Sequence, residues 1–137
     1  MKNILVIGAT GQIGSELTLK LREIYGNTHV VCGYIPSAKP RGELRESGPF
    51  EICDVTNPEQ IATVVLKHHV DTIYNLAALL SVVAEGRPQL AWKIGIDGLW
   101  NVLEVAREHE CAVFTLSATG STEIYTPRDN VPQDTIQ

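Results

Sequence analysis

The hydrophobic pattern of the chain alternates between short apolar runs and longer segments with helical spacing. Short apolar runs are typical of strands that are covered on both faces in a parallel sheet. The predicted strands are Asn3–Ile7, His29–Tyr34, Phe50–Asp54, Thr72–Ala77 and Cys111–Leu116. Between them, apolar residues recur at helical spacing. They predict a helix that follows a glycine-rich turn and ends at Gly26-Asn27, a second from Asn57-Pro58 to His69, and a long third from about Gln89 to His109.

The connecting segments differ in character. In the first predicted helix one apolar face is expected, formed by Ile13, Leu17, Leu21 and Ile24. The segment Ile35–Gly48 is rich in Pro, Gly and charged residues, which indicates a surface excursion with room for a short helical turn. The segment Ala78–Pro88 is expected to be a loop.

Strands and helices alternate along the whole chain, which predicts an α/β fold with right-handed crossovers and helices on both faces of a parallel sheet. A strand order of third, second, first, fourth and fifth would make it a Rossmann-like, doubly wound sheet, truncated after about the fifth strand. Residues 1–137 then form one dinucleotide-binding domain, without a substrate domain. In such a sheet the turn after the first strand lies at the topological switch point, where ligands bind.

That turn carries the strongest chemical signal. Gly8, Gly11 and Gly14 follow the first strand with the spacing Gly-x-x-Gly-x-x-Gly, and the helical pattern begins at once. Missing Cβ atoms let the backbone turn tightly and approach a pyrophosphate, and a helix start attracts anions through its N–H groups and dipole. The sequence therefore predicts that a dinucleotide places its pyrophosphate at residues 11–14.

Composition excludes several classes of partner. The 137 residues carry a net charge of −5, which argues against nucleic acid or an anionic membrane as a partner. No apolar run is long enough to span a membrane, and the N-terminus shows no export signal, so we expect a cytoplasmic protein. Three widely spaced cysteines without a C-x-x-C pair fit reduced, mostly buried thiols. The four histidines form no convincing ligand set, so no metal site is expected.

With these residues in hand, the chain resembles the extended short-chain dehydrogenase/reductase superfamily, and most closely its bacterial NAD-dependent L-threonine 3-dehydrogenases. The resemblance spans the whole chain but only the N-terminal portion of the family's length. The run Ala77–Ser81 favours threonine dehydrogenases over the related nucleotide-sugar epimerases. The other matching segments are residues 8–17, 47–49, 54–55, 74–76, 91–92, 98–99, 101–106, 126–128 and 132–137.

The resemblance implies roles for particular residues. The pyrophosphate would lie on Gly11, Gln12 and Ile13. Asp54 and Val55 would flank the adenine, and residues 76–78 (Leu76, Ala77 and Ala78) would line the nicotinamide ribose. Ser81 and Ser117 would contact an amino-acid substrate, and Ser117 is also the candidate catalytic hydroxyl. The alternatives stay open: Asp54 could end its strand and start the next helix, and both serines could bond local backbone.

The chain also departs from the family pattern. A dinucleotide domain usually has an acid about 20 residues past the glycines, which binds the ribose hydroxyls. Tyr34 stands there instead, and it cannot make a carboxylate's bidentate contact. NAD as the cofactor therefore rests on the resemblance, and Lys39 and Arg41 leave room for a 2′-phosphate. Ala118 replaces the residue that usually carries the catalytic hydroxyl, so Ser117 or Thr119 would have to substitute.

The superfamily's general base is a Tyr with a Lys four residues on. None of the four tyrosines in residues 1–137 has a Lys at that offset. Three hypotheses follow: the NAD-binding portion of an L-threonine 3-dehydrogenase, a related epimerase or dehydratase, and a non-catalytic NAD(P)-binding sensor. We favour the first. In the family the long helix joins a dimer's helix bundle, so self-association, most simply as a homodimer, is also expected.

Overall fold

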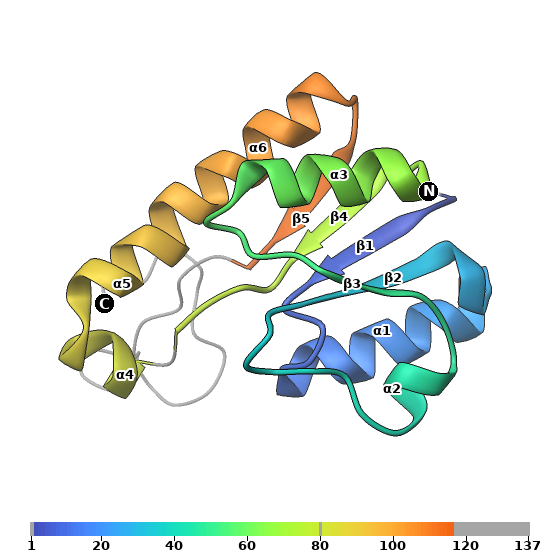
Figure 1. Cartoon of the computed structure of the whole chain (residues 1–137), viewed down its shortest axis with the longest axis horizontal. Coiled ribbons are helices and arrows are strands. Elements are labelled where there is room, and N and C mark those ends of the chain that lie inside the picture. Colours follow the sequence, from blue (N-terminus) through green and yellow to red (C-terminus); the bar gives the residue numbers. More distant parts are fainter. Residues whose placement is uncertain (1, 80, 117–137) are drawn as a thin grey trace, which may run out of the picture.

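A parallel sheet of five strands forms the centre of the structure (Figure 1). In this computed structural model, residues 2–79 and 81–116 are described, and of Ser81 and Val82 only the backbone. The strands are β1 (Ile4–Ile7), β2 (Val30–Tyr34), β3 (Phe50–Ile52), β4 (Thr72–Asn75) and β5 (Ala112–Thr115). Their order, β3-β2-β1-β4-β5, confirms the predicted topology. Each strand is shorter than predicted by one or two residues, because strand ends follow hydrogen bonding and not hydrophobicity.

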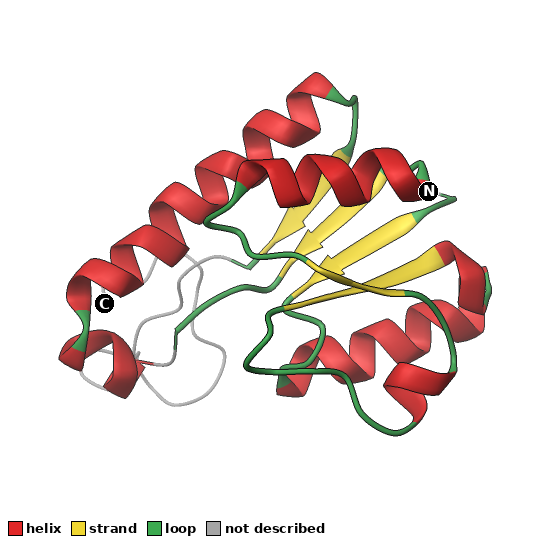
Figure 2. Ribbon diagram, in the orientation of Figure 1, coloured by secondary structure: helices red, strands yellow, loops and turns green. Residues whose placement is uncertain are grey.

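Helices cover both faces of the sheet, as Figures 1 and 2 show. On one face lie α1 (Gln12–Tyr25) and the short α2 (Glu43–Glu46), which is the helical turn expected in the surface excursion. On the other face lie α3 (Pro58–His68) and α6 (Gly98–Glu108). A 3₁₀ turn, η1 (Asn27–His29), takes up the start of the predicted second strand. This two-sided cover explains why β1 is buried at all four positions and reads as a continuous apolar run.

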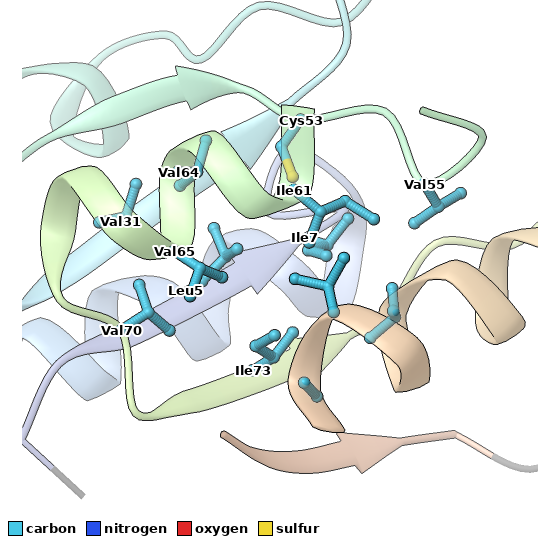
Figure 3. Close-up of a cluster of buried hydrophobic side chains, with 13 residues drawn as sticks. Leu5, Ile7, Val31, Cys53, Val55, Ile61, Val64, Val65, Val70 and Ile73 are labelled. Atoms are coloured by element: carbon cyan, nitrogen blue, oxygen red, sulfur yellow. The ribbon is translucent and has the colours of Figure 1, made fainter. Parts of the chain in front are cut away.

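The core is divided by the sheet into two clusters of buried side chains. Figure 3 shows the larger one, in which α3 places Ile61, Val64 and Val65 over Leu5 and Ile7 of β1. The smaller cluster lies on the opposite face, where α1 packs on the remaining β1 side chains, and includes Ile4, Val6, Ala9, Leu21, Val30, Cys32 and Leu44. Alternate residues of β1 therefore anchor the two layers, as the period of a strand requires.

The prediction for the apolar face of α1 was right for Leu21, which is buried, and for Leu17, which packs against the core, and wrong for Ile13 and Ile24. Ile13 and Ile24 are 61% and 60% exposed, and the residues that α1 buries are Gly14, Thr18, Leu21 and Arg22. Thr18 Oγ1 donates a hydrogen bond to the Gly14 carbonyl at 2.7 Å, so its hydroxyl is satisfied within the helix. The buried face of α1 is therefore rotated relative to the predicted one. Gly14 permits a close approach to the sheet, and the buried polar side chains of Thr18 and Arg22 find hydrogen-bond partners.

Arg22 is the largest of these buried polar groups, with 2% of its surface exposed. Its guanidinium donates to the carbonyls of Val30 (3.2 Å), Leu44 (2.6 Å) and Pro49 (2.7 Å) and to Ser47 Oγ (2.9 Å). The four acceptors belong to β2 and to the excursion that follows it. Arg22 thus ties α1 to the segment between β2 and β3, which borders the ligand side of the sheet.

The region between β4 and β5 also differs from the prediction. The expected loop contains a short helix, α4 (Ser81–Gly86), whose six residues are too few to show a hydrophobic period. The expected single helix is α5 (Pro88–Trp92), a π-helical segment η2 (Lys93–Asp97) and α6 in succession. The widened turn places Gly98 against Val55, where an added Cβ would lie 2.7 Å from Val55 Cγ2. No helix in the described part of the chain is long and apolar enough to span a membrane.

An exposed apolar stripe runs along α5, η2 and α6. It consists of Trp92, Ile96, Trp100 and Leu103, which recur at intervals of four, four and three residues and so share one side of the helical rod. We expect this stripe to pack against the same stripe of a second copy of the chain, because two apolar helix faces of this length can cover each other.

Sedimentation should therefore show a dimer at tens of micromolar. The variant Trp92→Glu/Trp100→Glu should be monomeric with an unchanged circular dichroism spectrum, because both side chains are exposed. A monomeric wild-type protein under the same conditions would contradict the assignment.

Candidate functional site

The turn between β1 and α1 has the geometry of an anion-binding loop. Gly8 has a φ of +79°, a conformation that favours glycine. The Gly11 N–H donates to the Gly8 carbonyl at 3.1 Å and closes the turn, and Gly11 then serves as the N-cap of α1 with extended backbone. The strand therefore leads into the helix within four residues.

Two of the glycines are required by close packing. A Cβ on Gly14 would lie 2.2 Å from the Gly8 carbonyl oxygen and 2.8 Å from Ala9 Cα, so the first turn of α1 rests directly on the loop. A Cβ on Gly8 would lie 3.0 Å from the Leu76 carbonyl carbon, where the chain leaves β4. At Gly11, by contrast, an added Cβ would meet only the Gly8 carbonyl oxygen, at 3.4 Å.

The first N–H groups of α1 are open to a ligand. Among the described residues, no backbone carbonyl accepts from the N–H groups of Gln12, Ile13 or Gly14. Gln12 and Ile13 are exposed, and Gly14 is buried beneath the loop. Unpaired N–H groups at a helix start, together with the helix dipole, form a site for a phosphate or pyrophosphate.

A cavity of about 480 Å³ opens beside this loop, at the carboxyl ends of the central strands. That volume lies in the range of small-molecule sites. Of the residues predicted to bind the cofactor, the structure brings Gly8, Gly11, Tyr34, Asp54, Val55, Leu76, Ala77 and Ala78 to its wall. The remaining three (Gln12, Ile13 and Gly14) form the adjoining start of α1.

Other lining residues were not predicted to bind the cofactor. They are Ile7, Thr10, Ile35, Ala38, Cys53, Thr56, Leu79, Leu90, Lys93 and Ile94. Cys53 is 1% exposed, and burial, reinforced by the charge of Asp54, raises the pKa of its thiol to about 12. The thiol is therefore neutral at pH 7 and acts as part of an apolar wall. Lys93 lines the cavity from η2. Its position depends on how the helical rod of α5, η2 and α6 packs on the sheet.

Asp54 forms the turn between β3 and α3, which was the alternative to a role in binding, and it also borders the cavity. Its Oδ1 accepts from the backbone N–H and the hydroxyl of Thr56, at 2.9 and 2.8 Å. This turn leads to Asn57, which caps α3 by accepting from the Gln60 N–H at 3.2 Å. Next to Asp54, the carbonyl of Val55 accepts from Asn101 Nδ2 at 2.9 Å, which holds this wall of the cavity to α6.

The side chains of both predicted substrate contacts lie outside the described residues. Ser81 is the first residue of α4, and its side chain lies outside the described residues. Ser117, the candidate catalytic residue, also lies outside the described residues, as do Ala118 and Thr119. Within the part of the chain that is described, no group of three His, Cys, Asp or Glu side chains could hold a metal ion.

Comparison with known proteins gives the family. The model of the NAD-dependent epimerase/dehydratase family matches residues 4–137. The chain belongs to this family. Its description also names NAD, the cofactor that the resemblance implies. The glycine turn, the open N–H groups and the cavity fit a dinucleotide.

Relatives of this epimerase/dehydratase-family chain include solved structures. An L-threonine dehydrogenase from Clostridium difficile is 45% identical, with a TM-score of 0.85 over 100% of this chain and 43% of that one. A GalE-like L-threonine dehydrogenase from Cupriavidus necator, in its holo form, is 41% identical, with a TM-score of 0.74 over 82% of this chain and 35% of that one. An uncharacterised epimerase/dehydratase of Staphylococcus haemolyticus is 45% identical over 100% of this chain and 43% of its own length. The chain thus spans less than half the length of these relatives.

The two loop glycines differ in a way that stability measurements can separate. Gly14→Ala should lower the free energy of unfolding by about 1–3 kcal/mol, because its Cβ would overlap backbone that cannot move aside. Gly11→Ala should cost less than about 1 kcal/mol, since it only weakens an N-cap. Urea unfolding of both variants tests this. Equal losses would mean that α1 does not rest on the loop as described.

Proposed function

We propose that this chain is the NAD-binding portion of an oxidoreductase of the L-threonine 3-dehydrogenase type, which converts L-threonine and NAD to 2-amino-3-oxobutyrate and NADH. The observation that carries the proposal is the cavity at the switch point, bordered by the glycine turn and the open N–H groups of α1. The similarity to the C. difficile and C. necator threonine dehydrogenases supports the substrate class.

The chain's own residues would bind and orient the cofactor. The N–H groups of Gln12, Ile13 and Gly14 would hold the pyrophosphate at the N-terminus of α1. The apolar segment Leu76–Ala78 would line the nicotinamide side, and Val55 would border the adenine. When bound, NAD accepts a hydride from the substrate. The walls contributed by Cys53 and Val55, which are almost fully buried, would exclude water from the cofactor.

Titration calorimetry with NAD tests the binding half of this proposal. Wild-type protein should bind NAD, and Gly11→Val should abolish binding, because the side chain would fill space that the phosphates need while the backbone at Gly11 (φ −73°) accepts any residue. The matched control is Gly86→Val, an exposed glycine with no atom within 4 Å of an added Cβ. Equal NAD affinity in wild type and Gly11→Val would displace the site from this loop.

The catalytic half is tested by NADH absorbance at alkaline pH. We expect the 137-residue chain to reduce NAD with L-threonine at no detectable rate, because no tyrosine in it is followed by a Lys four residues on. Loss of a general base costs about 10²–10⁴-fold in rate. A form extended by the remaining part of the C. difficile enzyme should oxidise L-threonine.

Three results would change the assignment. Robust turnover by the 137-residue chain would mean that its base is a different residue. Turnover of a nucleotide sugar, and not of L-threonine, by the extended form would favour the epimerase or dehydratase hypothesis. NAD binding by an extended form that turns over neither substrate would favour the sensor hypothesis.

A further inference from the structure

The adenosine end of the cavity has an unusual border. Tyr34 ends β2, where an acid normally binds the 2′-hydroxyl of the adenine ribose. Its ring packs against Phe50, with centroids 6.1 Å apart, and it lines the cavity. A carboxylate at this position would repel a phosphate group on the ribose, and a neutral phenol does not.

A second cavity, of about 460 Å³, adjoins the first at this end. Thr10 and Ala38 line both cavities, so the dinucleotide cavity and its neighbour adjoin at these residues. The second cavity lies between the excursion after β2 and the start of α1 with its glycine turn. The turn and α1 contribute Thr10, Ser15 and Leu19. From the excursion come Ser37, Lys39, Pro40 and Arg41, and α2 adds Glu43 and Leu44.

The charge around this second cavity is positive on balance. Lys39 and Arg41 line it, against the single carboxylate of Glu43. Lys39 also lines a smaller recess of about 240 Å³ together with Tyr34 and Arg45. Within the described residues, none of these three cations forms an ion pair or a side-chain hydrogen bond. All three are exposed and so available to a ligand.

Lysine and arginine beside a ribose are the groups that bind a 2′-phosphate, since both give charge-assisted hydrogen bonds to a phosphate oxygen. We propose that Lys39 and Arg41 form a 2′-phosphate subsite, so that the protein binds NADP with an affinity within about tenfold of its affinity for NAD. The inference rests on the proposed dinucleotide site, and it adds binding of NADP to the binding of NAD that the family description names.

Calorimetry with NAD and NADP tests the subsite. The variant Lys39→Ala/Arg41→Ala should lose about tenfold or more in NADP affinity and less than about twofold in NAD affinity. The matched control, Lys20→Ala/Arg107→Ala, removes two exposed cations that pair with Glu23 and Glu104 away from the cavity, and should change the ratio of the two affinities by less than about twofold. The fragments 2′,5′-ADP and 5′-AMP should reproduce the difference, because they differ by the same phosphate.

Further variants separate an effect on NADP binding from a loss of folded protein. Glu43→Gln should raise NADP affinity and leave NAD affinity unchanged, and Tyr34→Asp should lower NADP affinity relative to NAD. An affinity for NADP more than tenfold below that for NAD in wild type, or equal losses in the two double variants, would overturn the subsite while leaving the dinucleotide site intact. Failure of wild type to bind either dinucleotide would instead overturn the proposed function.

Discussion

The contact between Gly14 and the Gly8 carbonyl determines most of what the site can do. Because an added Cβ at Gly14 would lie 2.2 Å from that oxygen, α1 can begin directly on the end of β1 only if this residue is glycine. The contact fixes the direction of α1, leaves its first N–H groups without backbone partners, and points the positive end of its dipole toward the carboxyl edge of the sheet. The anion site is thus a consequence of how a helix packs on a strand, and it needs no charged side chain.

The cavity walls beyond the glycine turn are held by polar side chains that bind backbone. Arg22 gathers the carbonyls of Val30, Leu44 and Pro49, which shapes the excursion carrying the proposed 2′-phosphate subsite. Asn101 donates to the Val55 carbonyl and fixes the opposite wall. A buried guanidinium is costly unless its donors are satisfied, so the excursion can change its path only by leaving several donors and acceptors unpaired. Loops held in this way keep a preformed shape before any ligand binds.

Local signals allowed the sheet and its order to be predicted, since buried strands, glycine turns and the Asn57 cap are each encoded within a few residues. The errors arose where tertiary contacts decide. Ile13 and Ile24 had the spacing of a buried face, yet Gly14, Thr18 and Arg22 take that face because they fit closer or find hydrogen-bond partners. The π-helical turn and the approach of Gly98 to Val55 depend on how a helix meets a distant loop. The same holds for Lys93 in the site, whereas Tyr34 could be placed because strand ends converge at one edge, and Asp54 was placed by the resemblance.

Binding a dinucleotide and choosing between dinucleotides therefore depend on different parts of this chain. The proposed pyrophosphate site is made of backbone and of missing Cβ atoms, so it has few positions at which substitution could change its specificity without destroying it. The proposed 2′-phosphate subsite is made of the exposed side chains of Lys39 and Arg41, on an excursion that Arg22 anchors, so both can vary without disturbing the core. Tyr34 is half-buried at the end of β2. A tyrosine in place of the acid removes the charge that excludes a 2′-phosphate, and nearby cations then act on a ligand that the carboxylate would have repelled. With the proposed subsite, cofactor choice would be a balance of a few surface charges, which salt would screen, while cofactor binding would depend on the packing of α1 on β1.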